Sequence, residues 1–277
     1  MARPLRIVYP GAIYHVITRG NNRSRCFLDE GDFLLFLATF RQVLERFSWR
    51  LYAYCLLDNH YHLEIETPLP NLPAGMRQLN GLYAQAFNRR HARCGHVFES
   101  RYRAILVERE THLREVARYV VLNPVRAGIC TDPGEYRWSS YRATLGEATP
   151  EVPLALGALL SHFGDDLADA REGYRAFVEE GLEEALEERV RGERLGSEAF
   201  LRRRFGHDSP LPEIPRVQVE PIPPSLPEIF ARELLPVERA YRFHGYTIGQ
   251  IATFLGCHYS TVSRRLRREE EVAKCKT

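Results

Sequence analysis

Two histidines separated by one residue, His60 and His62, open a segment whose alternation predicts a β-strand. Side chains two positions apart on a strand point to the same face, so both imidazoles could bind one metal ion. A histidine pair in an alternating strand is also common as a surface or cross-strand pair, and the spacing alone favours that simpler interpretation. The pair by itself leaves both alternatives open.

Tyr119 and Asn123 lie four residues apart in a segment with helical periodicity. Residues at this spacing share one face of a helix, one turn apart. The carboxamide oxygen of Asn123 could be a third, neutral ligand for a cation that already has two imidazoles. Pro124 disfavours helical geometry at the residue before it, so the helix is predicted to end or kink at Asn123. A core tyrosine with a hydrogen-bonded hydroxyl is the alternative for Tyr119.

The elements that must position these residues alternate between strand and helix patterns. Strand patterns cover residues 12–19, 50–57, 60–66 and 97–107, and helical patterns cover 29–47, 71–93 and 111–122. Only Asp58 and Asn59 separate the second strand from the third, which predicts a tight hairpin. The order β-α-β-β-α-β-α predicts an α+β fold of the ferredoxin-like, split βαβ type: a four-stranded antiparallel sheet with its helices on one face.

The chain changes character after residue 145. Residues 146–209 are rich in acids and predict a helical extension, with helices at 152–162 and 165–189. Seven prolines in eighteen residues make 210–227 a semi-rigid linker. Residues 228–277 form a helical tail. We therefore divide the chain into an N-terminal domain at 1–145, the acidic extension, the linker and the tail.

Within the tail, residues 246–268 have the pattern of a helix-turn-helix. Thr247 can cap a first helix, Gly256 supplies the turn, and Ser260 can cap a second helix whose Val262 and Leu266 face inward. Short polar side chains and arginines remain on the outer side of the second helix: Ser260, Thr261, Ser263, Arg264, Arg265, Arg267 and Arg268. A recognition helix in a major groove needs such a face. A helical hairpin with a solvated basic face is the alternative, but turn, caps and charge together favour DNA binding.

Several segments of the N-terminal domain resemble the HUH endonucleases, whose pattern is His-hydrophobic-His followed by Tyr-x-x-x-Asn or Tyr-x-x-x-Gln. The resemblance is closer to the REP-associated tyrosine transposases among the single-tyrosine members, and it covers about residues 4–145. The segments that carry it are Tyr14-His-Val-Ile-Thr-Arg-Gly-Asn-Asn-Arg23, Asp58-Asn-His-Tyr-His62, Met76-Arg-Gln-Leu-Asn80, Phe87-Asn-Arg-Arg-His91, Gly95-His-Val-Phe98, Arg101-Tyr102, Tyr119-Val-Val-Leu-Asn-Pro-Val-Arg-Ala127 and Trp138-Ser-Ser-Tyr141. One departure is Tyr61, which is amphipathic where the pattern has an aliphatic residue.

The resemblance implies a metal-dependent DNA nuclease and strand transferase that acts on single-stranded palindromic hairpins. It makes His60, His62 and Asn123 the metal ligands, with Mg²⁺ or Mn²⁺ as the ion, and Tyr119 the nucleophile that forms a 5′-phosphotyrosine. Arg19, Asn21, Asn22 and Arg23 resemble the DNA-contacting loop of the family, and Arg101 and Arg103 are further DNA-binding candidates on the last predicted strand. Surface arginines without a role are the alternative at each of these positions. We expect a monomer or a homodimer, with duplex DNA bound through the tail.

Charge is distributed unevenly along the chain. Residues 1–145 contain 20 arginines against 13 acidic residues, whereas residues 146–215 contain 8 arginines against 16 acidic residues. The basic N-terminal part could face phosphates, and the acidic middle part could not easily do so. Six cysteines without a C-x-x-C pair, no apolar run of membrane-spanning length and no signal sequence predict a cytoplasmic protein with reduced thiols.

Two other functions compete with the nuclease and transferase. The first is a non-catalytic DNA-binding regulator that keeps the same fold as a binding platform. The second is a metal phosphodiesterase that uses water and does not need Tyr119. The presence of the tyrosine, both histidines and the asparagine together favours catalysis by the tyrosine.

Overall fold

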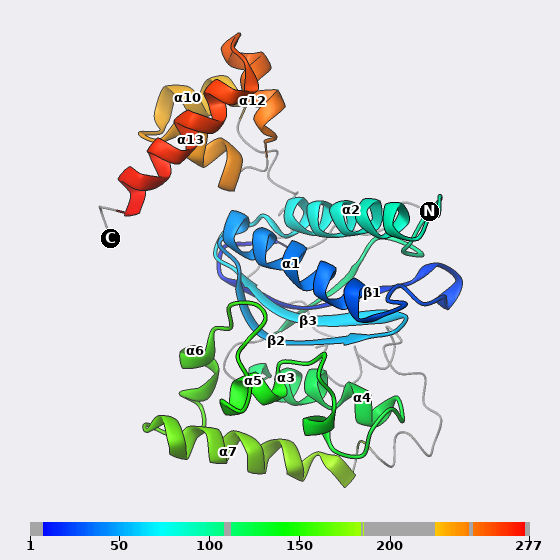
Figure 1. Ribbon diagram of the computed structural model, residues 1–277. Helices are drawn as coiled ribbons and strands as arrows, with labels where there is room; N and C mark the ends of the chain where they lie inside the picture. The colour runs from blue at the N-terminus through cyan, green and yellow to red at the C-terminus, as the bar shows by residue number, and fades with distance from the viewer. Residues whose placement is uncertain (1–7, 108–111, 184, 186–224, 244–245, 275–277) are drawn as a thin grey trace.

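The computed structural model describes residues 8–107, 112–183, 185, 225–243 and 246–274. A four-stranded antiparallel sheet lies at the centre of the N-terminal domain (Figure 1). Its strands are β1 (Ala12–Arg19), β2 (Arg50–Leu57), β3 (His60–Thr67) and β4 (Arg103–Val107), in the order β2-β3-β1-β4. This is the strand order of a split βαβ unit, and the predicted fold class is confirmed.

Two long helices, α1 (Glu30–Phe47) and α2 (Leu72–Arg90), cover one face of the sheet. Asp29 caps α1, since its side chain accepts a hydrogen bond from the backbone N–H of Asp32. The apolar side of α1 packs on alternate residues of the strands, among them Tyr14 and Val16 of β1. A short 3-10 turn, η1 (Asn21–Arg23), leads from β1 toward α1.

The prediction that all helices cover one face is wrong, because α3 (Leu113–Val121) lies on the opposite face (Figure 1). Four further short or medium helices pack on that side: α4 (Asn123–Arg126), α5 (Tyr141–Leu145), α6 (Leu156–Leu160) and α7 (Leu167–Glu180), with a 3-10 turn, η2 (Pro133–Glu135), between α4 and α5. Strand β2 explains the second layer: Tyr52 and Cys55 face α3 while Tyr54 and Leu56 face α1, so both faces of the sheet are apolar and must be covered.

Several predicted boundaries differ from the structure. The strand predicted at 97–107 begins only at Arg103, because residues 97–100 run beside the end of β1, where Glu99 N–H donates to the carbonyl of Arg19. The helix predicted at 111–122 breaks at Leu122, one residue before the predicted position, and α4 starts at Asn123. The helix predicted at 152–162 is reduced to α6, and α7 begins at Leu167.

The acidic segment after residue 145 shares the core of the α3 layer. Leu159 of α6 and Tyr174 of α7 are buried in the same cluster as Val120 of α3. The described part of this segment therefore packs on α3 through its apolar residues, while its acids face outward. Most of residues 184–224, including nearly all of the predicted linker, lie outside the described residues, and the division of the chain into domains stays a prediction.

The tail folds around a small core of its own. Its helices are α10 (Leu226–Arg232), α11 (Pro236–Glu238), the π-helical turn η3 (Arg239–Phe243), α12 (Ile248–Leu255) and α13 (Tyr259–Lys274). Thr247 caps α12 in a capping box with Gln250, and Gly256 ends it in the left-handed conformation with φ +61°. Since α13 begins at Tyr259, Ser260 lies in its first turn and does not cap it, contrary to prediction. Val262 and Leu266 face the core as expected.

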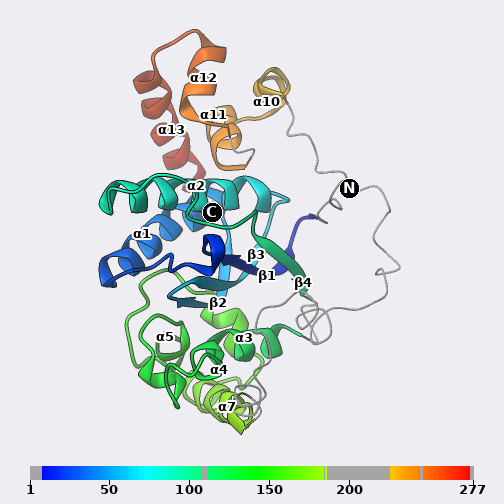
Figure 2. The same ribbon diagram turned by 90° about the vertical axis from the view of Figure 1, so that its right-hand side faces the viewer.

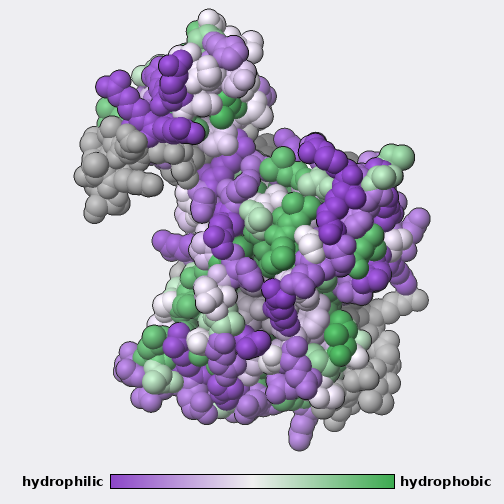
Figure 3. Space-filling view, in the orientation of Figure 1, coloured by the Kyte–Doolittle hydropathy of each residue, from purple (hydrophilic) through white to green (hydrophobic). Residues whose placement is uncertain are grey.

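Arg46, near the end of α1, contacts the tail. Its guanidinium donates to the carbonyls of Tyr241 at 3.2 Å and Tyr246 at 3.0 Å, and it lies 3.8 Å from the ring centroid of Tyr241. Figures 1 and 2 place the tail on the α1 and α2 side of the sheet, away from α3 and α7. Figure 3 shows mostly hydrophilic side chains on the visible face of the tail, whereas hydrophobic side chains gather over the sheet domain.

Gly75 of α2 offers a test of the packing between α2 and the end of α1. A Cβ at this position would lie 2.1 Å from Cζ2 of Trp49, whose indole N–H is fixed by a hydrogen bond to Asn71. Glycine to alanine in a helix normally stabilises by about 1 kcal/mol. Here we expect Gly75→Ala to destabilise by about 1–3 kcal/mol, because overpacking outweighs propensity. Denaturant unfolding measures the difference.

Gly81, in the same helix, is the matched control. A Cβ there meets no heavy atom within 4 Å, so Gly81→Ala should keep the favourable helix propensity and stabilise the protein. If both variants shifted the unfolding midpoint in the same direction, the close contact between Gly75 and Trp49 would be contradicted.

Candidate functional site

The predicted histidine pair lies on the α3 face of the sheet, at the start of β3. His60 follows the two-residue turn and pairs with Arg19 at the end of β1, and His62 pairs with Ile17. The two rings are 5.0 Å apart between centroids. Because β3 lies inside the sheet, both rings are covered: His60 is 9% exposed and His62 is fully buried.

One nitrogen of each ring is fixed by a neighbour. His60 Nδ1 is 2.6 Å from Oδ1 of Asn59 in the turn, and His62 Nδ1 is 2.9 Å from Nε2 of His15 on β1. These contacts orient both rings and determine which nitrogen is left over. In each case the remaining nitrogen is Nε2.

Helix α3 brings Tyr119 against this pair. The ring of Tyr119 lies 6.0 Å from His62 and 5.6 Å from His15 between centroids, both edge-to-face, and only 1% of the residue is exposed. Asn123 follows at the break between α3 and α4, where its Nδ2 donates to the carbonyls of Tyr119 at 2.8 Å and Val120 at 3.2 Å. The break at Leu122 thus lets an asparagine side chain satisfy carbonyls at the end of α3.

The residues present fit a divalent cation. Nε2 of His60, Nε2 of His62 and Oδ1 of Asn123 are buried and have no hydrogen-bond partner within the described part of the chain. Buried polar atoms normally have a partner. In each of these three residues the other polar atom is engaged, so two imidazole nitrogens and one carboxamide oxygen remain as lone-pair donors of the kind that Mg²⁺ or Mn²⁺ accepts.

The charge states of the histidines suit the same role. Burial, followed by the positive charge of Arg19, lowers the pKa of His60 to about 3. Burial lowers the pKa of His62 well below its usual value, and the neighbouring His60 and His15 act in the same direction. Both imidazoles are therefore neutral near pH 7, as metal ligation requires.

Three buried residues near the site had no role assigned from the sequence. His15 contacts His62 and Tyr119. Arg126 of α4 donates to the Tyr119 carbonyl at 2.9 Å, with its guanidinium 4.5 Å from the Tyr119 ring centroid. Glu64 lies two residues beyond His62 on the same face, and burial raises its pKa well above the usual value. Strand alternation combined with the strand order places His15 and Glu64 on the α3 face, and this signal could have found them.

The predicted DNA-binding residues form two separate groups. At the end of β1, Arg19 lies beside His60, and with Arg101, Arg103 and Glu99 it lines a small open hollow. The turn η1 next to it holds Asn21, Asn22 and Arg23, all without buried side chains. The structure thus brings the first group to the rim of the histidine site.

The second group is the outer face of α13, in the tail. Arg264, Arg267 and Arg268 are exposed there, whereas Arg265 pairs with Glu269 at 3.0 Å. The remaining predicted residues of this face lie in the first two turns of α13: Ser260, Thr261 and Ser263. Helix α13 lies with the rest of the tail on the α1 and α2 side of the sheet, opposite to α3 (Figure 2).

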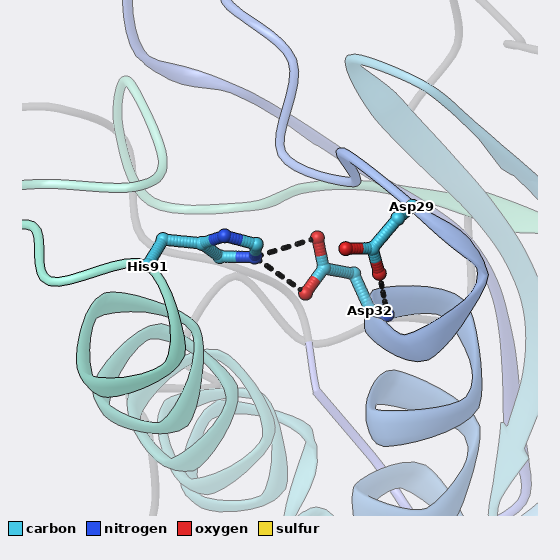
Figure 4. Close-up of side chains that lie close together, drawn as sticks. All are labelled: Asp29, Asp32 and His91. Carbon is cyan, nitrogen blue, oxygen red and sulfur yellow. Dashed lines mark hydrogen bonds and ion pairs between the residues drawn. The ribbon is translucent and has the colours of Figure 1, made fainter.

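A second cluster with metal-ligating side chains, Asp29, Asp32 and His91, links the start of α1 to the end of α2 (Figure 4). Arg90 already offsets part of its negative charge, since it donates to Asp29 at 2.7 Å and to Asp32 at 2.9 Å. Asp32 also accepts from His91 and from the backbone N–H of Leu28. We therefore assign this cluster to the packing of two helix ends.

The family model of IS200-like transposases matches residues 9–123, which include β1, both histidines, Tyr119 and Asn123. Residues 9–123 are therefore similar to the IS200-like transposase family. This family consists of tyrosine transposases, which are nucleases, and the expected family is confirmed.

Among solved structures, the chain is similar to the REP-associated tyrosine transposase bound to a REP hairpin. The two are 14% identical with a TM-score of 0.48, over 56% of this chain and 96% of that chain. No curated protein matches this chain. Within the described residues, no helix is long and apolar enough to cross a membrane.

We expect Asp32→Asn to lower the free energy of unfolding by about 1–3 kcal/mol. The buried carboxylate accepts hydrogen bonds from Leu28, Arg90 and His91, and an amide in its place would leave some of these donors unpaired. Asp29→Asn is the matched control, and its half-exposed side chain predicts a smaller loss. Thermal unfolding with and without EDTA gives the comparison. Stabilisation by added Mn²⁺ that Asp32→Asn abolishes would contradict the purely structural role.

Proposed function

We propose that this transposase is an endonuclease and strand transferase for single-stranded DNA that recognises palindromic hairpins, with Tyr119 as the nucleophile and a divalent cation held by His60, His62 and Asn123. The observation that supports it most is the set of buried, unpartnered ligand atoms around a buried tyrosine: two belong to histidines on one strand face, with His62 beside Tyr119, and the third belongs to Asn123 at the end of the helix that carries Tyr119. The hairpin substrate rests on the motif segments shared with REP-associated transposases.

In the proposed reaction, the Tyr119 hydroxyl oxygen attacks the phosphorus of the scissile phosphodiester. The new phosphorus–oxygen bond forms as the bond to the 3′-oxygen breaks, and that oxygen leaves as a 3′-hydroxyl after taking a proton. The product is a 5′-phosphotyrosine. Attack by the 3′-hydroxyl of another strand reverses the step and joins the strands, because the phosphotyrosine ester preserves the energy of the original bond.

Mg²⁺ or Mn²⁺, when bound, would neutralise a non-bridging phosphate oxygen and orient the bond for in-line displacement. Arg126 holds the Tyr119 backbone carbonyl and places a positive charge against the ring, where negative charge develops as the phenol loses its proton. Arg19, Arg101 and Arg103 at the adjacent hollow provide the positive charge for the flanking phosphates.

Tyr119→Phe tests the central step. The substitution removes only the nucleophilic oxygen and keeps the ring, so cleavage of a single-stranded hairpin oligonucleotide should be lost while hairpin affinity stays within a few-fold of the wild type. The covalent protein–DNA adduct, detected on a denaturing gel, measures cleavage. Fluorescence anisotropy measures the affinity for the hairpin.

Tyr102→Phe is the control, because it removes another buried tyrosine hydroxyl outside the cluster with His62. It should leave the adduct yield unchanged. Cleavage by Tyr119→Phe at the wild-type rate would exclude the tyrosine mechanism in favour of a water-dependent phosphodiesterase. Absence of cleavage by the wild type, with binding intact, would favour a DNA-binding regulator.

For the tail, we propose duplex binding through α13. Replacing the exposed Arg264, Arg267 and Arg268 by serine should weaken binding to a hairpin with a duplex arm of about 20 base pairs and leave the isolated hairpin unaffected. Each lost phosphate contact should reduce the salt dependence of binding by about one unit. The same substitution at Arg232, an exposed arginine of α10, is the control. If the DNA affinity of all variants depended on salt to the same extent, α13 would not contact DNA phosphates and would have only a structural role.

A further inference from the structure

His15 lies in the middle of β1, with β3 on one side and β4 on the other. Its side chain points to the α3 face and is fully buried. There it forms a closed triangle of rings with His62 and Tyr119: the centroids of His15 and His62 are 5.2 Å apart, His15 and Tyr119 5.6 Å, and His62 and Tyr119 6.0 Å. His15 therefore touches both a proposed metal ligand and the proposed nucleophile.

We infer that His15 is a positioning residue for the metal site: its Nε2 accepts the Nδ1 hydrogen of His62 and thereby keeps the lone pair of His62 on Nε2, facing the cation. This inference rests on the proposed function, in which His62 is a ligand. The two nitrogens are 2.9 Å apart, a normal hydrogen-bond distance.

The direction of this hydrogen bond decides whether His62 can bind a metal. A neutral imidazole carries one hydrogen, so a hydrogen on Nδ1 leaves Nε2 with a free lone pair. With the opposite arrangement, His15 would donate from Nε2, and the single hydrogen of His62 would occupy Nε2 and block ligation. Only an acceptor at position 15 is compatible with His62 as a ligand through the nitrogen that the structure leaves without a partner.

Packing alone gives a weaker account of a histidine at this position. Neighbouring residues of β1 on the same face, Ile13 and Ile17, are apolar and equally buried. A buried imidazole costs free energy that an aliphatic side chain does not, unless its nitrogens are hydrogen-bonded. The hydrogen bond to His62 supplies the reason for a polar residue here, as in metal sites where the second nitrogen of a ligating histidine is held by a neighbour.

Mn²⁺ binding to the full-length protein without DNA tests the inference. His15→Phe keeps a ring against Tyr119 but removes the acceptor, and we expect its affinity for Mn²⁺ to fall about 10–100-fold, as for other partners of ligating histidines. His15→Gln restores an acceptor oxygen at a similar distance from the backbone and should bind more tightly than His15→Phe. Electron paramagnetic resonance of free Mn²⁺ gives the affinities. His60→Ala, which removes a proposed ligand, shows how far the Mn²⁺ affinity falls when a ligand is lost.

Ile13→Ala is the matched control, since it weakens the same buried layer without touching His62 through a polar atom. It should lower thermal stability while leaving the Mn²⁺ affinity unchanged. Cleavage by His15→Phe should recover at saturating Mn²⁺, which a variant with a disrupted fold would not do.

The outcomes separate the inference from the proposed function. If wild type binds Mn²⁺ and His15→Phe binds it equally well, or if Ile13→Ala loses as much affinity, His15 has only a packing role and the inference is overturned. If wild type and His60→Ala both bind no Mn²⁺, the proposed metal site is wrong, and the inference fails with it.

Discussion

The hydrogen bond between His15 and His62 lies in the buried layer between the sheet and α3, beside the apolar residues of that layer. In such a layer each polar atom needs a partner, because an unpaired one costs about 1–3 kcal/mol. In each candidate ligand the fold provides a hydrogen-bond partner for one of the two polar side-chain atoms. The partners are Asn59 for Nδ1 of His60, His15 for Nδ1 of His62, and the carbonyls of α3 for Nδ2 of Asn123. The atoms left over in these three residues, Nε2 of His60, Nε2 of His62 and Oδ1 of Asn123, are the ones that we propose as metal ligands.

The same constraint explains why the site needs a second layer of helices. Imidazoles on an exposed face of a sheet would be hydrated and free to change rotamer. Covering the face with α3 excludes water, keeps the histidines neutral and brings Tyr119 against them on a rigid element. The break at Leu122 then turns Asn123 back toward the carbonyls of the helix that carries Tyr119. One packing arrangement thus positions the proposed metal ligands and the proposed nucleophile.

Local patterns predicted the strands, the long helices, the hairpin at Asp58 and the cap at Thr247, because each depends on residues a few positions apart. The sequence was less informative about tertiary structure, that is, about which elements pack together. Whether α3 joins α1 or covers the other face depends on both faces of β2 being apolar, which is clear only once the strand order is known. The roles of His15 and Arg126 depend on contacts across 47 and 7 residues of sequence. Motif spacing suggested candidate ligands and a candidate nucleophile, but it carries no information about the residues that orient them.

The position of the tail constrains how the two proposed DNA-binding surfaces could act on one molecule. His60 starts β3, whereas Arg46, which contacts the tail, lies near Arg50, whose partner Glu66 is close to the other end of β3. Eight residues of strand span about 25 Å, and the tail lies on the opposite face of the sheet. At 3.4 Å per base pair, that length alone corresponds to about seven base pairs. A hairpin that fills only the histidine site would therefore not reach α13, and in our proposal the tail binds the duplex beyond the hairpin.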